Sequence, residues 1–459
     1  MKTDTIAAIA TAMAGSGIGI VRISGEEAVS ITDQIFHMPG GKKLSDMETH
    51  TIHYGHIRDG EEVIDEVMVL LMRGPRSYTR EDTVEIDCHG GVYVMKRILE
   101  TVIKYGARPA EPGEFTKRAF LNGRIDLSQA ESVIDVISAK NEFALKSSMK
   151  QLSGAVSDAV KEIRGEILHE IAFIESALDD PEHISLDGYG ERLELTIEGA
   201  VDRIEKLLAS SDNGRILKEG ISTVIVGKPN AGKSSLLNTL LGEERAIVTE
   251  IAGTTRDVLE EQINLNGIIL NIIDTAGIRD TDDIVEKIGV DKARKYVKDA
   301  DLILYVVDAS TNLDENDGEI MELLHGRRTI VLLNKSDLTP LTTVEDIRVH
   351  VDKDCPVISI SAREQKGIDV FTEQIRKMFF RGEVTFNDEV YITNIRHKTA
   401  LQEALSSLHL VEQSIADGMP EDFYSIDLMN AYEVLGTIIG EAVEDDLVNE
   451  IFSKFCMGK

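Results

Sequence analysis

The sequence predicts a multidomain protein that combines α/β domains with an all-α domain. Its 459 residues are too many for one hydrophobic core, and 42% of them are hydrophobic, so two to four globular domains are expected. Strand-like runs alternate with helical segments in residues 1–118 and again in residues 216–382. Residues 119–215 and 383–459 instead carry long amphipathic stretches in which strand runs are scarce. We therefore expect an N-terminal α/β domain and a helical domain whose two chain segments flank an inserted α/β domain.

The N-terminal domain is expected to be a compact α/β unit. Its β-like runs lie at 18–23, 66–72 and 83–87, and helical segments near 26–36 and 91–105 alternate with them.

The start of the helical domain carries a capping signal. Ser128-Gln-Ala-Glu131 has the spacing of a capping box, which predicts a helix that opens there and continues through Ile137. Breaks between helices are expected near residues 179–181 and 188–190, where proline and glycine occur.

Five strand candidates alternate with helical segments in the inserted domain. They lie at 221–226, 268–273, 302–307, 329–333 and 356–360. This alternation is typical of a doubly wound, mostly parallel sheet.

The net charge and the cysteine content narrow the possible binding partners and the cellular compartment of the protein. The formal net charge of −32 argues against a protein that holds nucleic acid by its overall field, although a local basic patch or a partner can still supply contacts. Cys88, Cys355 and Cys456 lie far apart and form neither a zinc pattern nor a disulfide framework, which suits a reducing cytosol. No run of about 18 apolar residues is present, so we expect a cytoplasmic protein that does not cross a membrane.

The most informative stretch runs from Gly227 to Ser235 and fits the phosphate-loop pattern G-x-x-x-x-G-K-[ST]. A β-branched run precedes it and a helical run follows it, which is the context that a phosphate loop requires. Backbone N–H groups and the helix N-terminus would surround phosphate oxygens, Lys233 would reach the β- and γ-phosphates, and Ser234 would bind Mg²⁺. The residues expected to hold the nucleotide here are Asn230, Ala231, Gly232, Lys233, Ser234 and Ser235.

Two further motifs are expected to serve the metal and the γ-phosphate. The segment Gly253-Thr-Thr-Arg-Asp257 offers a threonine to Mg²⁺. In the next motif a carboxylate would hold the metal through water and a glycine N–H would sense the γ-phosphate. The residues of that motif are Asp274, Thr275, Ala276 and Gly277.

The last two motifs predict that the base is guanine. Asn334-Lys335-Ser-Asp337 offers a carboxylate that can accept both the ring N–H and the exocyclic amine of guanine, a pair that adenine lacks. Ser361 and Ala362 would contact guanine O6 through backbone N–H groups. Five motifs in order, each beside a strand, predict a Ras-like P-loop GTPase domain.

One absence bears on the mechanism. Ras-like enzymes place a catalytic glutamine directly after the DxxG motif, but here that position is Ile278. Three replacements remain open: an arginine finger in cis, an acid of the following loop that positions water, or a monovalent cation between the β- and γ-phosphates. The candidate side chains for the first two are Arg256, Arg279, Asp280, Asp282, Asp283 and Glu286.

Over essentially its whole length the chain resembles the MnmE (TrmE) family of bacterial and organellar tRNA-modification GTPases. Its tail, Phe455-Cys-Met-Gly-Lys459, is specific, because a Cys-x-Gly-Lys ending on a GTPase points to this family. The other segments that carry the resemblance are 4–11, 17–25, 112–122, 227–235 and 253–257.

The resemblance implies a folate site and a homodimer in the N-terminal domain. The ligand would be 5-formyltetrahydrofolate or a related folate, held by Arg22, Glu85, Arg124 and Lys459. Cys456 would lie near this pocket, either as a chemical thiol or as a small apolar side chain.

The resemblance also implies a GTPase that potassium activates, which accounts for the missing glutamine. Asn230 matches a K⁺ ligand, with Thr249, Ile251 and Thr254 at the other ligand positions. Thr255 and Ser234 match Mg²⁺ ligands, and Glu286 matches an acid that assists the attacking water. The candidate catalytic residues are therefore Asn230, Lys233, Asp274, Glu286 and Cys456.

Members of this family act with the flavoprotein MnmG, in a heterotetramer or larger complex, on the wobble uridine of certain tRNAs. The pair adds an aminomethyl or carboxymethylaminomethyl group to C5, and the one-carbon unit comes from a folate. The acidic charge of the chain fits a division of labour in which the partner makes much of the tRNA contact.

Two alternatives remain. A ribosome-assembly GTPase of the Era or Der type should bring a basic RNA-binding module such as KH, whereas residues 441–446 are acidic and no GXXG loop occurs in the C-terminal block. A folate enzyme with a purely regulatory G domain is the second.

Overall fold

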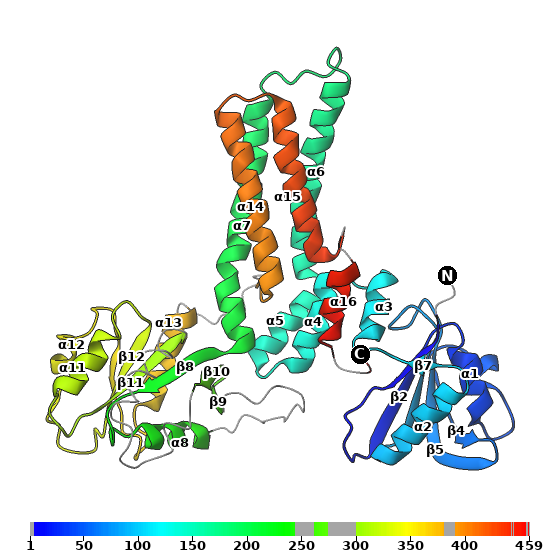
Figure 1. The fold of residues 1–459 in the computed structure, drawn as a ribbon, viewed down its shortest axis with the longest axis horizontal. Coiled ribbons are helices and arrows are strands. Elements are labelled where there is room, and N and C mark those ends of the chain that lie inside the picture. Colours follow the sequence, from blue (N-terminus) through cyan, green and yellow to red (C-terminus); the bar gives the residue numbers. More distant parts are fainter. Residues whose placement is uncertain are drawn as a thin grey trace. The chain divides into compact units, whose positions relative to one another are not determined.

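The computed structural model describes residues 4–243, 261–273, 300–380, 391–441, 443, 445–455 and 458. The chain divides into two compact units, and Figure 1 labels many of their elements. The first unit comprises residues 1–137, 149–201 and 400–459, and the second comprises residues 138–148 and 202–399.

The N-terminal part of the first unit forms a seven-stranded sheet in the order β3-β4-β5-β6-β2-β1-β7. Neighbouring strands are antiparallel, except that β1 and β7 pair in parallel. The strands are β1 (Ile6–Ile9), β2 (Ile18–Ser24), β3 (Phe36–His37), β4 (Thr51–Asp59), β5 (Glu62–Met72), β6 (Thr83–His89) and β7 (Arg108–Pro109).

The two faces of this sheet differ, because side chains alternate along each strand. Residues such as Val21 and Ile86 face one core with α1 (Ala28–Ile35), α2 (Val92–Lys104) and the 3₁₀ turn Leu44–Asp46. On the opposite face, Phe115 of α3 (Glu114–Leu121) packs with Ile6 and Ala8 of β1. Farther along that face, Ile52, Tyr54 and Met68 of β4 and β5 are exposed. The predicted strands and helices of this domain are confirmed.

Helices from both sides of the inserted domain form one bundle, as the sequence predicted. The 25-residue α6 packs along α15, which lies more than 200 residues later in the chain. Their buried faces repeat every three or four residues, with Ile163, Ile167 and Ile171 on α6 and Leu428 and Leu435 on α15. The helices are α4 (Leu127–Ser138), α5 (Glu142–Leu152), α6 (Ala155–Asp179), α7 (Tyr189–Glu219), α14 (Ile395–Ala416), α15 (Glu421–Ile439) and α16 (Asp445–Ser453).

The capping box predicted at Ser128 and Glu131 is wrong by two residues. The helix α4 already begins at Leu127, and its cap is Asp126. The Asp126 carboxylate accepts the Gln129 backbone N–H, and the Gln129 side chain accepts the Asp126 backbone N–H, both at 3.0 Å. Ser128 instead donates its hydroxyl to Asp126. Aspartate caps a helix at least as well as serine does, so Asp126 and not Ser128 occupies the N-cap position.

The inserted domain contains a six-stranded sheet in the order β13-β12-β11-β8-β10-β9 (Figure 1). Every neighbouring pair is parallel except β9 and β10. The strands are β8 (Ile221–Val226), β9 (Glu261–Leu265), β10 (Ile268–Ile272), β11 (Leu302–Asp308), β12 (Thr329–Asn334) and β13 (Val357–Ser359).

This sheet is buried on both faces, as expected for a doubly wound fold. Leu304 and Val306 of β11 face one core with helices α8 (Lys233–Glu243) and α13 (Ile368–Phe380). Ile303, Tyr305 and Val307 face the other core with α11 (Glu315–Glu322) and α12 (Val344–Arg348). The five predicted strands are confirmed, and β9 is an addition that the sequence reasoning missed.

None of the helices that the structure describes combines the length and the apolar character that a membrane span needs.

Candidate functional site

The loop between β8 and α8 is shaped by residues with positive φ angles. Gly227, Asn230 and Gly232 have φ values of 151°, 61° and 98°. A Cβ on Gly232 would lie 2.1 Å from Nδ2 of Asn334, and one on Gly227 would lie 2.3 Å from the carbonyl oxygen of Val306. Both positions therefore require glycine, while asparagine tolerates the left-handed region better than most residues. The backbone has the tight curl of a phosphate loop.

Lys233, the first residue of α8, folds back over this loop. Its Nζ donates to the carbonyl oxygens of Gly227 at 2.7 Å and Lys228 at 2.8 Å. Burial lowers the pKa of Lys233, because the charged form loses hydration. Ser234 and Ser235 follow in the first turn, the former half-buried and the latter exposed. The predicted phosphate-binding lysine therefore already lies at the loop.

Asn334, at the end of β12, joins three of the predicted motifs. Its buried amide donates Nδ2–H to the carbonyl oxygen of Ala231 at 2.9 Å and accepts the backbone N–H of Ala362 at 3.1 Å. The carbonyl oxygen of Ala362 in turn accepts the hydroxyl of Thr239 from α8 at 2.7 Å. One side chain thus holds the phosphate loop and the predicted base-contacting backbone together.

Asp337 is held as an exposed carboxylate at the same edge of the sheet. Ser361 donates its hydroxyl to Oδ1 of Asp337 at 2.6 Å. This bond, with smaller contributions from Arg363 and Lys366, lowers the pKa of Asp337. An ionised carboxylate beside the Ser361 backbone is suited to accept two parallel N–H donors.

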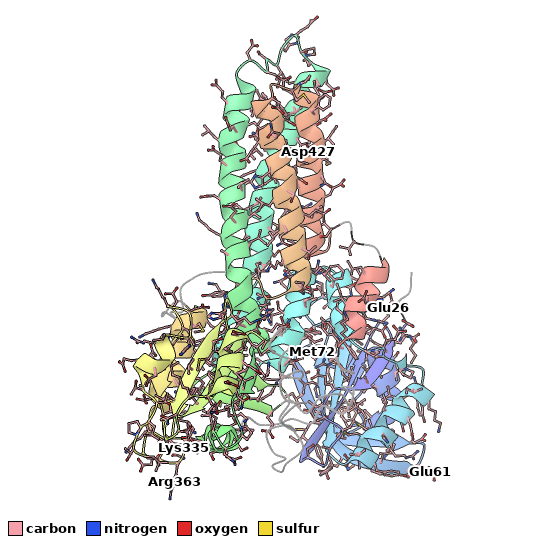
Figure 2. The ribbon with its side chains drawn as sticks, turned by 60° about the vertical axis from the view of Figure 1, so that its left-hand side comes forward. Glu26, Glu61, Met72, Lys335, Arg363 and Asp427 are labelled. Atoms are coloured by element: carbon pink, nitrogen blue, oxygen red, sulfur yellow. The ribbon has the colours of Figure 1, made fainter. Side chains whose placement is uncertain are left out.

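Lys335 precedes this carboxylate and is bound to a residue that the sequence reasoning did not select. Lys335 has a φ of 63°, and its Nζ donates to Oδ2 of Asp308 at 2.5 Å. Figure 2 labels Lys335 and Arg363, which come from the loops after β12 and β13. Asp308 ends the neighbouring strand β11, so the strand order itself was the signal that could have found it.

A second cluster lies in the N-terminal domain around Arg22. Arg22 of β2 donates Nε–H to Oε1 of Glu85 on β6 at 2.7 Å, and the two residues are directly opposite in register. Its Nη1 donates to the carbonyl oxygen of Gly458 at 3.0 Å, which places Gly458 beside the pair. The Arg22 guanidinium also lies 5.6 Å from the ring of Phe115.

Tyr78 joins Arg124 to this cluster. The Arg124 guanidinium lies 4.7 Å from the centre of the Tyr78 ring, and the Arg22 guanidinium lies 6.0 Å from it. The Tyr78 hydroxyl pairs with the hydroxyl of Thr116 at 2.9 Å. The structure thus brings together three of the four residues predicted for the folate pocket. Tyr78 itself was missed, because contacts between a ring and guanidinium groups leave no local pattern in a sequence.

Comparison with known proteins decides the family. Residues 5–124 match the family model described as "GTP-binding protein TrmE N-terminus", and residues 127–456 match the one described as "MnmE helical domain". The chain is 61% identical over 460 residues to the tRNA modification GTPase MnmE of Lachnoclostridium phytofermentans, covering 100% of both chains. The chain belongs to the MnmE family of tRNA modification GTPases.

Other members of the MnmE family match over nearly the whole chain. The Clostridioides difficile protein is 50% identical, with 99% of each chain covered, and the Bacillus subtilis protein is 47% identical, with 99% of this chain and 100% of that one covered. Among solved structures, the G domain of the T. maritima FeoB iron transporter matches 34% of this chain and 97% of its own, with 23% identity and a TM-score of 0.26.

Several residues that the motifs or the MnmE resemblance predict for the sites lie outside the described part of the chain. They are Thr249, Ile251, Thr254, Thr255, Asp274, Thr275, Ala276, Gly277, Glu286, Cys456 and Lys459, together with Ile278 and the alternative residues Arg256, Arg279, Asp280, Asp282 and Asp283. Among the described residues, no three His, Cys, Asp or Glu side chains converge as metal ligands.

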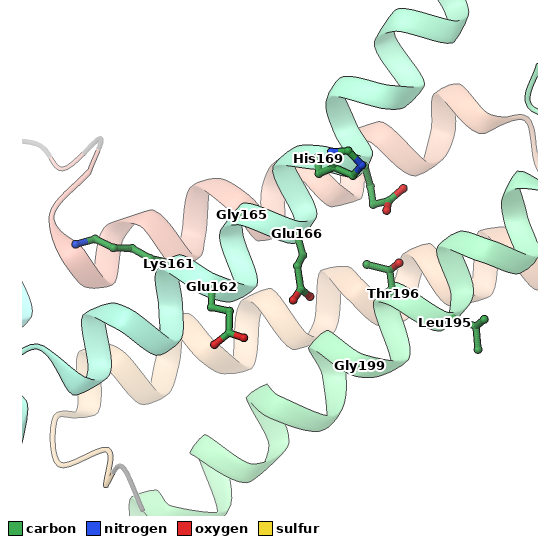
Figure 3. A pocket seen from close by; sticks show the side chains of 9 residues that line it. Lys161, Glu162, Gly165, Glu166, His169, Leu195, Thr196 and Gly199 are labelled. Carbon is green, nitrogen blue, oxygen red and sulfur yellow. The ribbon is translucent and has the colours of Figure 1, made fainter. Parts of the chain in front are cut away.

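A groove of about 550 Å³ lies between α6 and α7 in the helical domain. In Figure 3, the carboxylates of Glu162 and Glu166 on α6 point toward the stretch of α7 that contains Gly199. No predicted site residue lies here. The lining residues are Lys161, Glu162, Gly165, Glu166, His169, Glu170, Leu195, Thr196 and Gly199.

Proposed function

We propose that this member of the MnmE family binds GTP at the loop after β8 and hydrolyses it as part of tRNA modification. The observation that carries nucleotide binding is the side chain of Asn334, which joins the phosphate loop to the Ala362 backbone and so places both at one site. Asp337 then presents its carboxylate where a guanine would offer two N–H donors. Family membership supports tRNA modification as the process in which hydrolysis serves.

Replacing Lys233 tests whether GTP turnover is required. We expect Lys233→Ala to abolish GTP hydrolysis and tRNA modification, because the loop loses the cation that contacts the phosphates. Lys377→Ala, which removes an exposed lysine of α13, should leave both unchanged. Modification of tRNA that persists in Lys233→Ala without hydrolysis would contradict the proposal.

We further propose that Mg²⁺ and K⁺ assist the reaction. The donors proposed for Mg²⁺ are the hydroxyls of Ser234 and Thr255, and those for K⁺ are Asn230, Thr249, Ile251 and Thr254. Oxygen donors suit such hard cations, and the exposed side chain of Asn230 at the loop supports a ligand role. Asp274 would support the metal, and Glu286 would assist the attacking water.

The backbone at Asn230 allows a clean test of the potassium proposal. Glycine adopts a φ near 61° without strain, so Asn230→Gly removes the amide oxygen and keeps the shape of the loop. We expect hydrolysis to be faster in KCl than in NaCl at equal ionic strength, and Asn230→Gly to lose that difference. Equal rates of the unaltered protein in the two salts would exclude the potassium role and would direct attention to Arg256.

We also propose that the N-terminal domain binds a folate one-carbon donor, through Arg22, Glu85, Arg124 and Lys459. Arg22 and Arg124 both lie beside Tyr78, and Arg22 binds Glu85, which supports this proposal because guanidinium groups pair well with the carboxylates of a folate glutamate tail. Cys456 is proposed to lie near the bound carrier. Arg124→Ala should weaken binding of 5-formyltetrahydrofolate in an equilibrium titration, and unchanged affinity would contradict its role.

The proposed assembly is a homodimer that joins the flavoprotein MnmG in a heterotetramer or larger complex and acts on the wobble uridine of tRNA. The exposed side chains of Ile52, Tyr54 and Met68 on one face of the N-terminal sheet support self-association there. Sedimentation of Met68→Glu tests this: a monomer is expected, and an unaltered dimer would place the interface elsewhere.

A further inference from the structure

A second lysine of the phosphate loop, Lys228, binds the start of helix α11 through its side chain. Its Nζ lies 2.6 Å from Oδ2 of Asp317 and donates to Oδ2 of Asp314 at 2.8 Å. Only 19% of the Lys228 side chain and 2% of the Asp317 side chain are exposed, so water screens this pair little. Hydrogen bonds between charged groups are stronger than neutral ones, and the ammonium therefore fastens the loop to α11.

The acceptor Asp317 is itself held in place. Its Oδ1 accepts the hydroxyl of Tyr305, a buried residue of β11, at 2.8 Å. Its Oδ2 accepts the backbone N–H of Asp314 at 3.0 Å, and Asp314 caps the first turn of α11. Asp317 cannot move without breaking bonds to a central strand and to a helix cap.

The segment between β11 and α11 is also bound to the chain that follows the predicted guanine motif. The carbonyl oxygen of Ala309 accepts the backbone N–H groups of Leu341 at 2.7 Å and Thr342 at 3.1 Å. The buried Thr342 donates its hydroxyl to the carbonyl oxygen of Thr311 at 2.6 Å. The anchor of Lys228 thus belongs to the framework that carries the base-contacting motif.

The backbone of Lys228 connects this anchor to the phosphate-binding lysine. The carbonyl oxygen of Lys228 accepts the N–H of Ala231 at 3.3 Å and Nζ of Lys233 at 2.8 Å. The preceding residue is Gly227, whose φ of 151° lies in a region that is open to glycine. Because glycine restrains the chain least, the side chain of Lys228 is what fixes the start of the loop.

We propose that Lys228 is a positioning residue for GTP binding, and that its bonds to Asp317 and Asp314 hold the phosphate loop in shape before the nucleotide arrives. The proposal rests on the proposed GTP function and deepens it, because the phosphate-loop pattern leaves this position unspecified. A loop that is already formed binds more tightly, since the cost of ordering it is not subtracted from the binding free energy.

Steady-state GTP hydrolysis by the full chain tests this role, with KM and kcat measured separately. We expect Lys228→Met to raise KM by about tenfold and to leave kcat unchanged, because the loop is then formed for only part of the time. Lys228→Arg keeps a cation for the two carboxylates and should return KM to within about threefold of the unaltered value. A KM that stays unchanged in Lys228→Met, or stays raised in Lys228→Arg, would overturn the proposal.

A double variant separates position from stability. Lys228→Met alone leaves the buried Asp317 carboxylate without its cation, which destabilises the domain. Asp317→Asn in the same chain removes that charge, so the melting temperature should recover while KM stays raised. Recovery of both quantities would mean that Lys228 contributes stability alone, and the positioning role would be lost.

Arg215→Met is the matched control. Arg215 pairs with Asp301 at 2.6 Å, directly before the start of β11, so the variant removes a cation and an ion pair from the same sheet. We expect it to keep KM and kcat unchanged, and a KM raised as much as in Lys228→Met would count against a specific role. If the unaltered protein does not hydrolyse GTP at all, the proposed function itself fails. Hydrolysis with an unchanged KM in Lys228→Met leaves that function standing and removes only the role of Lys228.

Discussion

Single side chains decide what the nucleotide site can distinguish. The amide of Asn334 binds both the phosphate loop and the Ala362 backbone and so sets the distance between them. The Ser361 hydroxyl keeps Asp337 ionised by stabilising the charged form. Base recognition therefore depends on a carboxylate whose charge and direction are both set by a neighbour.

Asp337→Asn should change the nucleotide preference. The amide cannot accept two N–H donors from guanine, and loss of a charge-assisted hydrogen bond costs about 1.5–3 kcal/mol, or roughly 10- to 100-fold in affinity. A xanthine base, which carries a carbonyl where guanine has its amine, should bind the variant better than it binds the unaltered protein. Titration with fluorescent GTP and xanthosine triphosphate measures both effects. GTP affinity that stays unchanged in the variant contradicts the role of Asp337.

The elements of the fold show where sequence reasoning succeeds. Strands such as β8, β11 and β12 were predicted because short apolar runs rich in β-branched residues are typical of a strand buried on both faces. The strand β9 was missed, although Asn266-Gly267 turns it into β10 with φ values of 51° and 89°. Asn-Gly is the strongest short hairpin signal, so this strand was predictable.

The residues of the candidate sites also fall into those that a local motif predicts and those that only the fold brings together. The phosphate loop and the Asn334 segment are local motifs, so their positions followed from the sequence. The contacts of Arg22 with Gly458 and of Arg124 with Tyr78 join residues 436 and 46 positions apart, and no local pattern records them. The family resemblance selected the charged residues, but it could not supply Tyr78.

The corrected cap of α4 leads to a stability prediction. Asp126→Ala should destabilise the first unit by about 1 kcal/mol, because the Gln129 N–H loses its acceptor. Ser128→Ala should cost less, since the Ser128 hydroxyl accepts no N–H of the helix start and only donates to Asp126. Calorimetric melting of the two variants compares them. A larger loss in Ser128→Ala would restore the cap predicted from the sequence.

At the scale of the whole molecule, charge governs how the chain meets tRNA. A formal charge of −32 repels a polyanion, so contact with tRNA must come from a few local cations or from the proposed partner. This makes the flavoprotein the expected carrier of most phosphate contacts in the assembly.

The salt dependence of tRNA binding tests this division of labour. For the chain alone we expect weak binding, with a slope of log affinity against log salt that corresponds to few phosphate contacts. The flavoprotein alone should bind more tightly and show a steeper slope. Tighter and more salt-sensitive binding by this chain than by the partner would refute the idea.

The bonds that Lys233 makes to its own loop have a consequence for ligand choice. The carbonyl oxygens of Gly227 and Lys228 compete with a ligand for the Lys233 ammonium. A ligand must therefore bind the ammonium more strongly than these two oxygens do before the lysine moves to it. A nucleoside monophosphate has no second phosphate with which to do so and should leave the lysine where it is. A di- or triphosphate should displace the carbonyls and draw the lysine onto the β-phosphate. The bonds from Lys233 to its own loop therefore favour nucleotides that carry at least two phosphates.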